Sequence, residues 1–274
     1  MARLAFAALI LAACSSPSKA TLDAPPSPDA PHPSDARPLP DAPTDVPIDA
    51  PPMPDLSCLG QPPPGTAPDP LAVDGTVFAI DHYQVAPLPG ASVTLHRRSD
   101  DGVLATALTG SDGTFAMSVA TGGVALDAYY TVAATGELPS RIDPGDPMTT
   151  GFFALAVVAS DAEVQRWYGD AGASYGDGAS PLISIAVDCN HAAVDGASVA
   201  IAPGATITYY DAAAQRWNPS LGASTNGFAL ITGGATRETA TAAWHGQAFP
   251  PHAAVAPANT LSLAVASPYA PAAL

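Results

Sequence analysis

The pattern of hydrophobic positions changes twice along the chain. Residues 4–13 form an unbroken apolar run, whereas residues 15–70 contain few large apolar side chains. From residue 71 onward, short segments rich in Val, Ile, Leu and Phe alternate with turns of Gly, Asp and Asn. Short apolar segments bounded by turn residues are typical of β-strands. The pattern therefore predicts an N-terminal signal (residues 1–14), a linker (15–70) and an all-β folded part.

Two groups of six or seven strands are expected after residue 71. The first group is predicted at Thr76–Ile80, Ser92–Arg98, Val103–Thr109, Thr114–Val119, Leu126–Ala134, Ser140–Ile142 and Phe152–Ala159. The second is predicted at Ile183–Cys189, Ser198–Ile201, Thr206–Asp211, Gly227–Thr232, Glu238–His245 and Thr260–Ala266. Each group spans roughly 90 residues, the size of a small antiparallel sandwich. We expect two tandem antiparallel β-sandwiches, at residues 71–160 and 181–268.

Three segments of the first group recur in the second in the same order, which indicates a degenerate tandem duplication. The matched pairs are Gly90–Leu95 with Gly196–Ile201, Asp112–Met117 with Asn226–Leu230, and Leu155–Ser160 with Leu263–Ser267. Between the groups, Ser160 and Glu163 have the spacing of a capping box that opens a short helix reaching about Tyr168. Residues 161–180 are therefore predicted to be a connector.

The order of motifs in the first group resembles carboxypeptidase-regulatory-like domains. The resemblance is carried by Gly75-Thr-Val77, Pro87–Val93, Asp112–Phe115 and Tyr129–Ala134. It covers residues 71–160 well and 180–268 more loosely, because the second group lacks the Gly-x-Val opening and has the insert Ala212–Ser224. The resemblance implies a transthyretin-like β-sandwich without an active site of its own.

The N-terminal signal ends in a motif of its own. Arg3 precedes the apolar run, which at ten residues is too short to span a bilayer as a helix. Leu11-Ala-Ala-Cys14 resembles the lipobox of bacterial lipoproteins. The resemblance implies a lipidated Cys14, and Ser15 after it favours the outer membrane. The alternative is an ordinary signal peptide cut elsewhere, which leaves Cys14 without a role.

The linker contains 18 of the 31 prolines, and Asp23, Asp29, Asp35 and Asp41 recur every six residues. Such a segment buries too little surface to fold and favours disordered or polyproline II conformations. Proline and like charges both favour extension. Two interpretations are open: a semi-rigid spacer, or a low-complexity leader without a length requirement.

The charge balance restricts the class of partner. The chain has 25 acidic and 9 basic residues, a net charge of −16. Nucleic-acid binding requires basic surface, so this class is excluded as a prediction. Attraction to anionic lipid is disfavoured for the same reason, so the lipid anchor is the expected membrane contact.

The cysteines leave one pairing open. If Cys14 is lipidated, Cys58 and Cys189 remain as an even pair in a compartment that permits disulfides. The sequence does not show whether their Cα atoms are close enough to be bridged.

Catalytic and metal motifs are weak. Gly172-Ala-Ser174-Tyr-Gly176 satisfies G-x-S-x-G, but both flanks of Ser174 are loop rather than the strand and helix of a nucleophile elbow. The histidines lack zinc-ligand spacing. We therefore predict no catalytic residue, no metal and no cofactor, with a small esterase using Ser174 as the least favoured alternative.

Aromatic residues are the candidate binding positions. They are Tyr129, Tyr130, Tyr209, Tyr210, Trp217 and Trp244. Because neighbours in a strand point to opposite faces, one tyrosine of each adjacent pair is expected to enter the core and the other to face outward. Exposed Tyr and Trp are favoured at binding surfaces.

Together these observations predict a non-enzymatic, lipid-anchored protein of the cell envelope. Its β-sandwiches are expected to serve adhesion, or to bind an envelope protein or a polysaccharide. The alternative is a purely structural envelope spacer.

Overall fold

The computed structural model describes residues 53–149, 152–201, 204–234 and 236–271. The described residues from Pro54 onward belong to one compact unit. The predicted signal, Cys14 and the linker up to residue 52 lie outside the described residues. Within the described part, no helix is long and apolar enough to cross a membrane.

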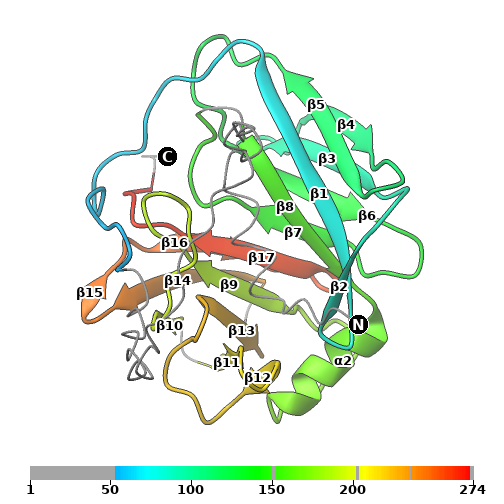
Figure 1. Cartoon of the computed structure of the whole chain (residues 1–274), viewed down its shortest axis with the longest axis vertical. Coiled ribbons are helices and arrows are strands. Elements are labelled where there is room, and N and C mark those ends of the chain that lie inside the picture. The colour runs from blue at the N-terminus through cyan, green and yellow to red at the C-terminus, as the bar shows by residue number, and fades with distance from the viewer. Residues whose placement is uncertain (1–52, 150–151, 202–203, 235, 272–274) are drawn as a thin grey trace, which may run out of the picture. The chain divides into compact units, whose positions relative to one another are not determined.

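The all-β class predicted from the sequence is confirmed (Figure 1). The first half contains β1 (Leu71–Asp81), β2 (Gln84–Pro87), β3 (Ser92–Arg97), β4 (Val103–Leu108), β5 (Thr114–Val119), β6 (Ala128–Ala133), β7 (Ser140–Asp143) and β8 (Phe152–Ala159). Helix α2 (Asp161–Asp170) follows, with Ser160 as its N-cap. The second half contains β9 (Leu182–Ala186), β10 (Ser198–Ala200), β11 (Thr206–Asp211), β12 (Arg216–Asn218), β13 (Phe228–Thr232), β14 (Arg237–Trp244), β15 (Gln247–Ala248), β16 (His252–Val255) and β17 (Leu261–Ala266).

The two halves share one sheet, which the sequence did not predict. Its nine strands follow the order β12-β11-β13-β9-β17-β7-β6-β3-β4, so β7 of the first half pairs with β17 of the second. A sheet of β1, β2, β5 and β8 belongs to the first half, and a sheet of β10, β14, β15 and β16 to the second. We expected residues 161–180 to separate two independent sandwiches. Instead, strand pairing between β7 and β17 joins the two halves on either side of this segment.

Most strand pairs are antiparallel, as expected, but three of the described pairs are parallel: β1·β8, β7·β17 and β9·β17. The central strands β9 and β17 are apolar along almost their whole length and are buried along most of it. Near-continuous apolar strands are typical of sheets covered on both faces. The composition of β9 and β17 thus fits their place in the middle of the shared sheet.

The pairing pattern supports the tandem duplication. In the first half, β1 pairs with β5 in the antiparallel and with β8 in the parallel sense. In the second half, β9 pairs with β13 and β17 in the same two senses. Likewise β3·β6·β7 in the first half corresponds to β10·β14·β16 in the second.

A tight corner recurs at equivalent positions in the two halves. The Val77 amide donates to the Gly113 carbonyl in one, and the Ala186 amide donates to the Gly227 carbonyl in the other. Both glycines have positive φ, 75° and 83°. A Cβ added at either would lie 2.9 Å from a neighbouring carbonyl oxygen. Glycine is therefore required twice, for conformation and for close approach.

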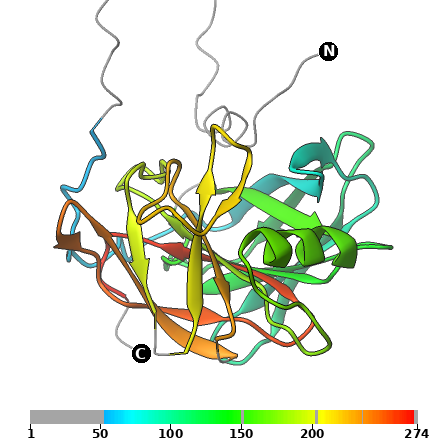
Figure 2. The same ribbon diagram turned by 90° about the horizontal axis from the view of Figure 1, so that it is seen from below.

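The largest apolar core lies between the sheets of the first half and continues beneath helix α2 onto the shared sheet. It includes Val93, Leu95 and Phe115 from the first half and Phe228 and Leu230 from the second. A second core lies on the opposite face of the shared sheet, around Tyr209 and Ile231. Figure 2 shows helix α2 in green beside the yellow strands of the second half. The second-half part of the shared sheet is thus covered on both faces.

Candidate functional site

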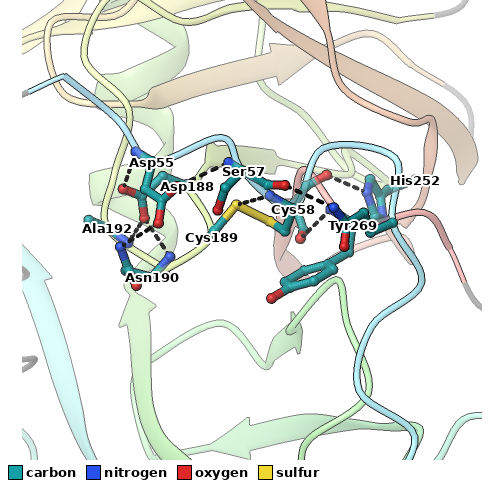
Figure 3. Close-up of a disulfide and its surroundings, with 11 residues drawn as sticks. Asp55, Ser57, Cys58, Asp188, Cys189, Asn190, Ala192, His252 and Tyr269 are labelled. Atoms are coloured by element: carbon teal, nitrogen blue, oxygen red, sulfur yellow. Dashed lines mark hydrogen bonds between the residues drawn. A yellow bond between two sulfur atoms is a disulfide. The ribbon is translucent and has the colours of Figure 1, made fainter.

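The junction between linker and folded part is built around a disulfide. Cys58 and Cys189, the pair left open by the sequence, form a disulfide with a Cα–Cα distance of 5.8 Å (Figure 3). Cys58 is buried and its amide donates to Cys189 Sγ at 2.9 Å. Cys58 precedes every strand of the first half, and Cys189 lies in the loop after β9. The bond therefore joins the start of the folded unit to its second half.

Asp188 organises the loop that carries Cys189. Its Oδ1 accepts the amides of Asn190 and Ala192 at 2.8 and 2.9 Å, and its Oδ2 accepts the Asp55 amide at 3.1 Å. The Cys189 amide donates in turn to the Asp55 carbonyl at 2.8 Å. One buried carboxylate thus holds both the loop and the incoming chain, as Figure 3 shows.

Residues 54–61, here called the N-terminal clasp, lie on the second half. Leu56 and Leu59 pack against a third core cluster that includes Phe249 and Ala266. The Gly60 amide donates to the Pro268 carbonyl, and the Ala270 amide donates to the Gln61 carbonyl, each at 2.8 Å. The clasp therefore contacts the C-terminal end of the second half. This differs from the expectation of a disordered linker up to residue 70.

Beyond the clasp the chain crosses to the first half before β1 begins (blue to cyan in Figure 1). Thr66 bridges Val124, the Ala67 amide donates to the Gly123 carbonyl, and Asp69 Oδ1 accepts the Thr121 amide at 2.9 Å. Residues 54–70 therefore contact both halves.

The four candidate tyrosines are all buried, with at most 6% of each residue exposed. The expectation that one tyrosine of each pair is exposed to solvent is wrong, although the members of each pair do point to opposite faces. Tyr209 lies in the second core, and its hydroxyl accepts the Val199 amide at 2.9 Å. Tyr210 points to the opposite face, where Tyr83 and Trp217 cover it at ring distances of 6.0 and 5.5 Å. Burial raises the pKa of Tyr210 to about 12.

Tyr129 is buried for a different reason, although Tyr130 follows the expected inward direction. The Tyr129 ring stacks on His96 at 5.0 Å, and the Arg141 guanidinium lies 3.5 Å from its centroid on the adjacent strand. Its hydroxyl donates to Asp101 Oδ1 at 2.8 Å. Polar neighbours on β3 and β7 therefore cover this outward-facing ring.

The two candidate tryptophans differ in exposure. Trp217 is 2% exposed and packs edge-on against Trp167 of helix α2 at 6.2 Å. Trp244 is half-buried beside His245, and its Nε1 donates to the Asp195 carbonyl at 2.9 Å. Of the six candidates, Trp244 alone is partly accessible.

Ser174 lies in a cleft of about 350 Å³. The cleft is lined by Tyr168, Ser174, Gly176, Asp177, Gly178, Ala179, Ser180, Gly233 and Gly234. No histidine is among these residues, and the chain flanking Ser174 is loop. The described lining of this cleft therefore lacks the histidine that commonly activates a serine nucleophile.

One group of potential metal ligands occurs in the described residues: Asp81, His82 and Glu163. Arg166 donates to Glu163 Oε2 and lies 3.0 Å from His82 Nε2, while His82 Nδ1 lies 2.7 Å from Asp81. The guanidinium thus already provides positive charge to this group. The arrangement fits an ion-pair network better than a metal site.

Glu163 is a structural carboxylate that sequence analysis identified only as part of a capping box. It is 1% exposed. Its oxygens accept the amides of His82 and Tyr83 at 2.8 and 3.2 Å, and Trp167 Nε1 at 2.8 Å. His82 and Tyr83 both have positive φ, so Glu163 stabilises a left-handed turn between β1 and β2.

Asp146 is a second buried carboxylate that the sequence did not single out. It is 7% exposed, and neither oxygen makes a hydrogen bond to another described residue. Burial raises its pKa, an effect that the nearby Ser267 hydroxyl and the histidines His252 and His191 partly offset. The preceding Gly145, with φ of 85°, lies directly against the Val265 carbonyl. Asp146 thus belongs to a loop of the first half that packs against β17.

Comparison with known proteins gives only distant structural similarities. No protein-family profile and no curated protein match the chain. Similar solved structures include the TIE protein of Bacillus anthracis (TM-score 0.25, 10% identity, 71% of this chain and 33% of that chain). The shaft pilin SpaA of Lactobacillus rhamnosus GG (0.23, 13%, 73% and 98%) and a streptococcal ancillary pilin (0.22, 12%, 64% and 53%) are others. The chain spans about a third of the TIE protein.

Proposed function

We propose that this chain is a non-enzymatic, lipid-anchored protein of a bacterial outer membrane, held through Cys14 and the linker. Its rigid double sandwich serves adhesion, by binding an envelope protein or a polysaccharide. The observation that carries the proposal is the junction at Cys58–Cys189, where the end of the linker is fastened covalently to the folded part. A disulfide at this place supports an oxidising compartment outside the cytoplasm.

The anchor is tested by expressing the full chain and its Cys14→Ser variant in a Gram-negative host. Mass spectrometry of the wild-type protein is expected to show an acylated N-terminal cysteine, and fractionation is expected to place it with the outer membrane. The Cys14→Ser variant is expected to lose both properties. A wild-type protein with an unmodified thiol in the soluble fraction contradicts the proposal.

The burial of five of the six candidate aromatics favours a second function, a structural spacer. The two functions are separated by measuring saturable binding of the folded protein to glycan arrays and to outer-membrane extracts of the host. Adhesion predicts saturable binding that Trp244→Ala weakens. Because Trp244 also packs against the third core cluster, the variant is first shown by thermal unfolding to be folded at the assay temperature. A spacer predicts no saturable binding. In either case, Ser174→Ala is expected to leave hydrolysis of activated esters at background.

A further inference from the structure

The disulfide encloses the whole first half in one covalent loop. Cys58 lies before β1 and Cys189 after β9, with a sequence separation of 131. Every strand of the first half, helix α2 and strand β9 of the second half therefore lie between the two cysteines. A pulling force applied between the N-terminal segment and the residues after Cys189 is transmitted through the disulfide. This covalent path is shorter than the path along the enclosed chain.

The N-terminal clasp directs such tension into the second half. Asp55 is hydrogen-bonded to Asp188 and Cys189 immediately before the disulfide. Leu56 and Leu59 pack on the second half, and the first contacts with the first half begin only at residues 65–67. Along the chain, the contacts of the N-terminal clasp with the second half thus come before the first contacts with the first half.

The first half has an apolar core and strand pairs of its own, which can keep it folded while it carries no load. Its two sheets face each other with Val73, Val77 and Phe115 on one side and Val93 and Leu95 on the other, all at most 4% exposed. Its strand pairs β1·β5, β1·β8, β3·β4, β3·β6 and β6·β7 are all internal to it. When the second half unfolds, the first half loses the β7·β17 pairing and the second-half residues of the largest core, but it keeps these internal strand pairs.

We propose that the Cys58–Cys189 bond is a mechanical bypass: load arriving along the linker passes into the second half, and the first half is shielded from it. The proposal rests on the proposed N-terminal tether. It assigns the first half the role of a folded support and the second half the role of the load-bearing part. Any partner that pulls on the second half, between Cys189 and the C-terminus, pulls against the anchor through this bond.

The test is force spectroscopy on the full chain with handles at both termini and Cys14→Ser to remove the third thiol. An extended residue spans about 3.3–3.6 Å, so the enclosed segment, with its sequence separation of 131, corresponds to roughly 450 Å of length. The oxidised protein is expected to extend roughly 450 Å less than the Cys58→Ser/Cys189→Ser variant. Equal lengths would overturn the proposal.

Shielding itself is tested at constant force, in the oxidised protein after the second half has unfolded. A dithiol is then added, which is oxidised to its disulfide as the two cysteines are reduced to thiols. If the first half is still folded, its length is released after a delay that shortens as the force is raised. Release of the full length at the moment of cleavage, at every force, shows that the first half was already unfolded and refutes the proposal.

This measurement needs only the wild-type pair of cysteines, so it stands even if the double variant fails to fold. Where the double variant folds, the dithiol is expected to have no effect on it. Because the handles replace the lipid, the result is independent of Cys14 acylation. A failed bypass and a failed lipid anchor are therefore distinguishable.

Discussion

Replacing Glu163 with glutamine tests whether one buried carboxylate holds the β1–β2 turn to helix α2. Its Oε1 accepts Tyr83 N–H and Trp167 Nε1–H, and its Oε2 accepts His82 N–H and a guanidinium N–H of Arg166. A glutamine fits the same space, but its NH₂ group has to replace one of these oxygens. In either orientation the NH₂ group then faces two donors.

The expected cost follows from the number of bonds lost. A hydrogen bond to a charged group contributes about 1.5–3 kcal/mol. Removing one partner of a buried ion pair costs about 3–5 kcal/mol, because the other charge is left without compensation. Two donors lose their acceptor at Glu163, and the Arg166 charge loses its partner. We therefore expect Glu163→Gln to lower the free energy of unfolding by about 3–5 kcal/mol, mainly through the two donors, because the Arg166 side chain is 33% exposed and stays partly hydrated.

The assay is urea unfolding followed by tryptophan fluorescence, with amide hydrogen exchange at His82 and Tyr83 as a local readout. Asp161→Asn is the matched control, because Asp161 is an exposed carboxylate in the first turn of the same helix. Its loss removes an interaction with the helix N-terminus of about 0.3–1 kcal/mol. The Tyr175 hydroxyl donates to Asp161 Oδ1, and the amide oxygen of asparagine can accept the same bond. If Glu163→Gln unfolds with the same midpoint and slope as Asp161→Asn, the reasoning about this carboxylate is refuted.

Three further predictions concern packing and charge. Asp146→Asn is expected to stabilise the protein at neutral pH. Because folding raises the pKa of Asp146, its ionised carboxylate lowers the free energy of unfolding once the pH rises above the ordinary value of 3.8. This destabilisation disappears in acid, so the urea midpoints of the two proteins should converge at low pH. Trp217→Ala is expected to cost about 3–5 kcal/mol in the same assay, and the half-buried Trp244→Ala clearly less; equal losses would contradict the assignment of Trp217 to the core. Gly227→Ala is expected to lower the thermal midpoint more than Gly178→Ala, because both have positive φ but an added Cβ meets neighbouring atoms only at Gly227. A smaller loss at Gly227 would argue against the close approach.

Local patterns were sufficient to place most strands. The predicted and observed bounds coincide for Thr114–Val119, Phe152–Ala159 and Thr206–Asp211. Each of these is a short run between turn residues, and its pairing partner did not need to be known. The helix was predictable for the same reason, because the Ser160 hydroxyl accepts the Glu163 amide within one turn.

Elements that depend on distant residues were missed. Strand β2 follows a two-residue turn at His82–Tyr83, which lacks the Asn-Gly or Asp-Gly signature of such hairpins. Glu163, about 80 residues further on, supplies the acceptors for both turn amides. The residues near this hairpin in the sequence therefore could not predict it. The same applies to Asp146, whose burial results from packing of the first half against β17.

The burial of the tyrosines shows where the alternation rule was applied too simply. The rule assigned Tyr209 and Tyr210 correctly to opposite faces of β11. It failed to predict their exposure because it assumed that one face of the strand meets solvent. On β11, one face meets the second core and the other meets Trp217 and Tyr83. The accessible candidate, Trp244, lies instead at the end of β14, beside the turn that leads into β15.

Continuous apolar strands occur in both halves, so the sequence carried no specific signal for the shared sheet. Leu182–Ala186 and Leu261–Ala266 are apolar almost without alternation, a composition that suits a strand covered on both faces. Strand β8, which has only one described partner, is apolar without any alternation as well, so composition alone does not single out the shared sheet. In the first half, the strand equivalent to β17 is β8, which pairs with β1 alone among the described strands. The duplicated units therefore differ in what their last strand meets: in the second half it receives β7, and that one added pairing converts two sandwiches into a single unit that the disulfide then closes.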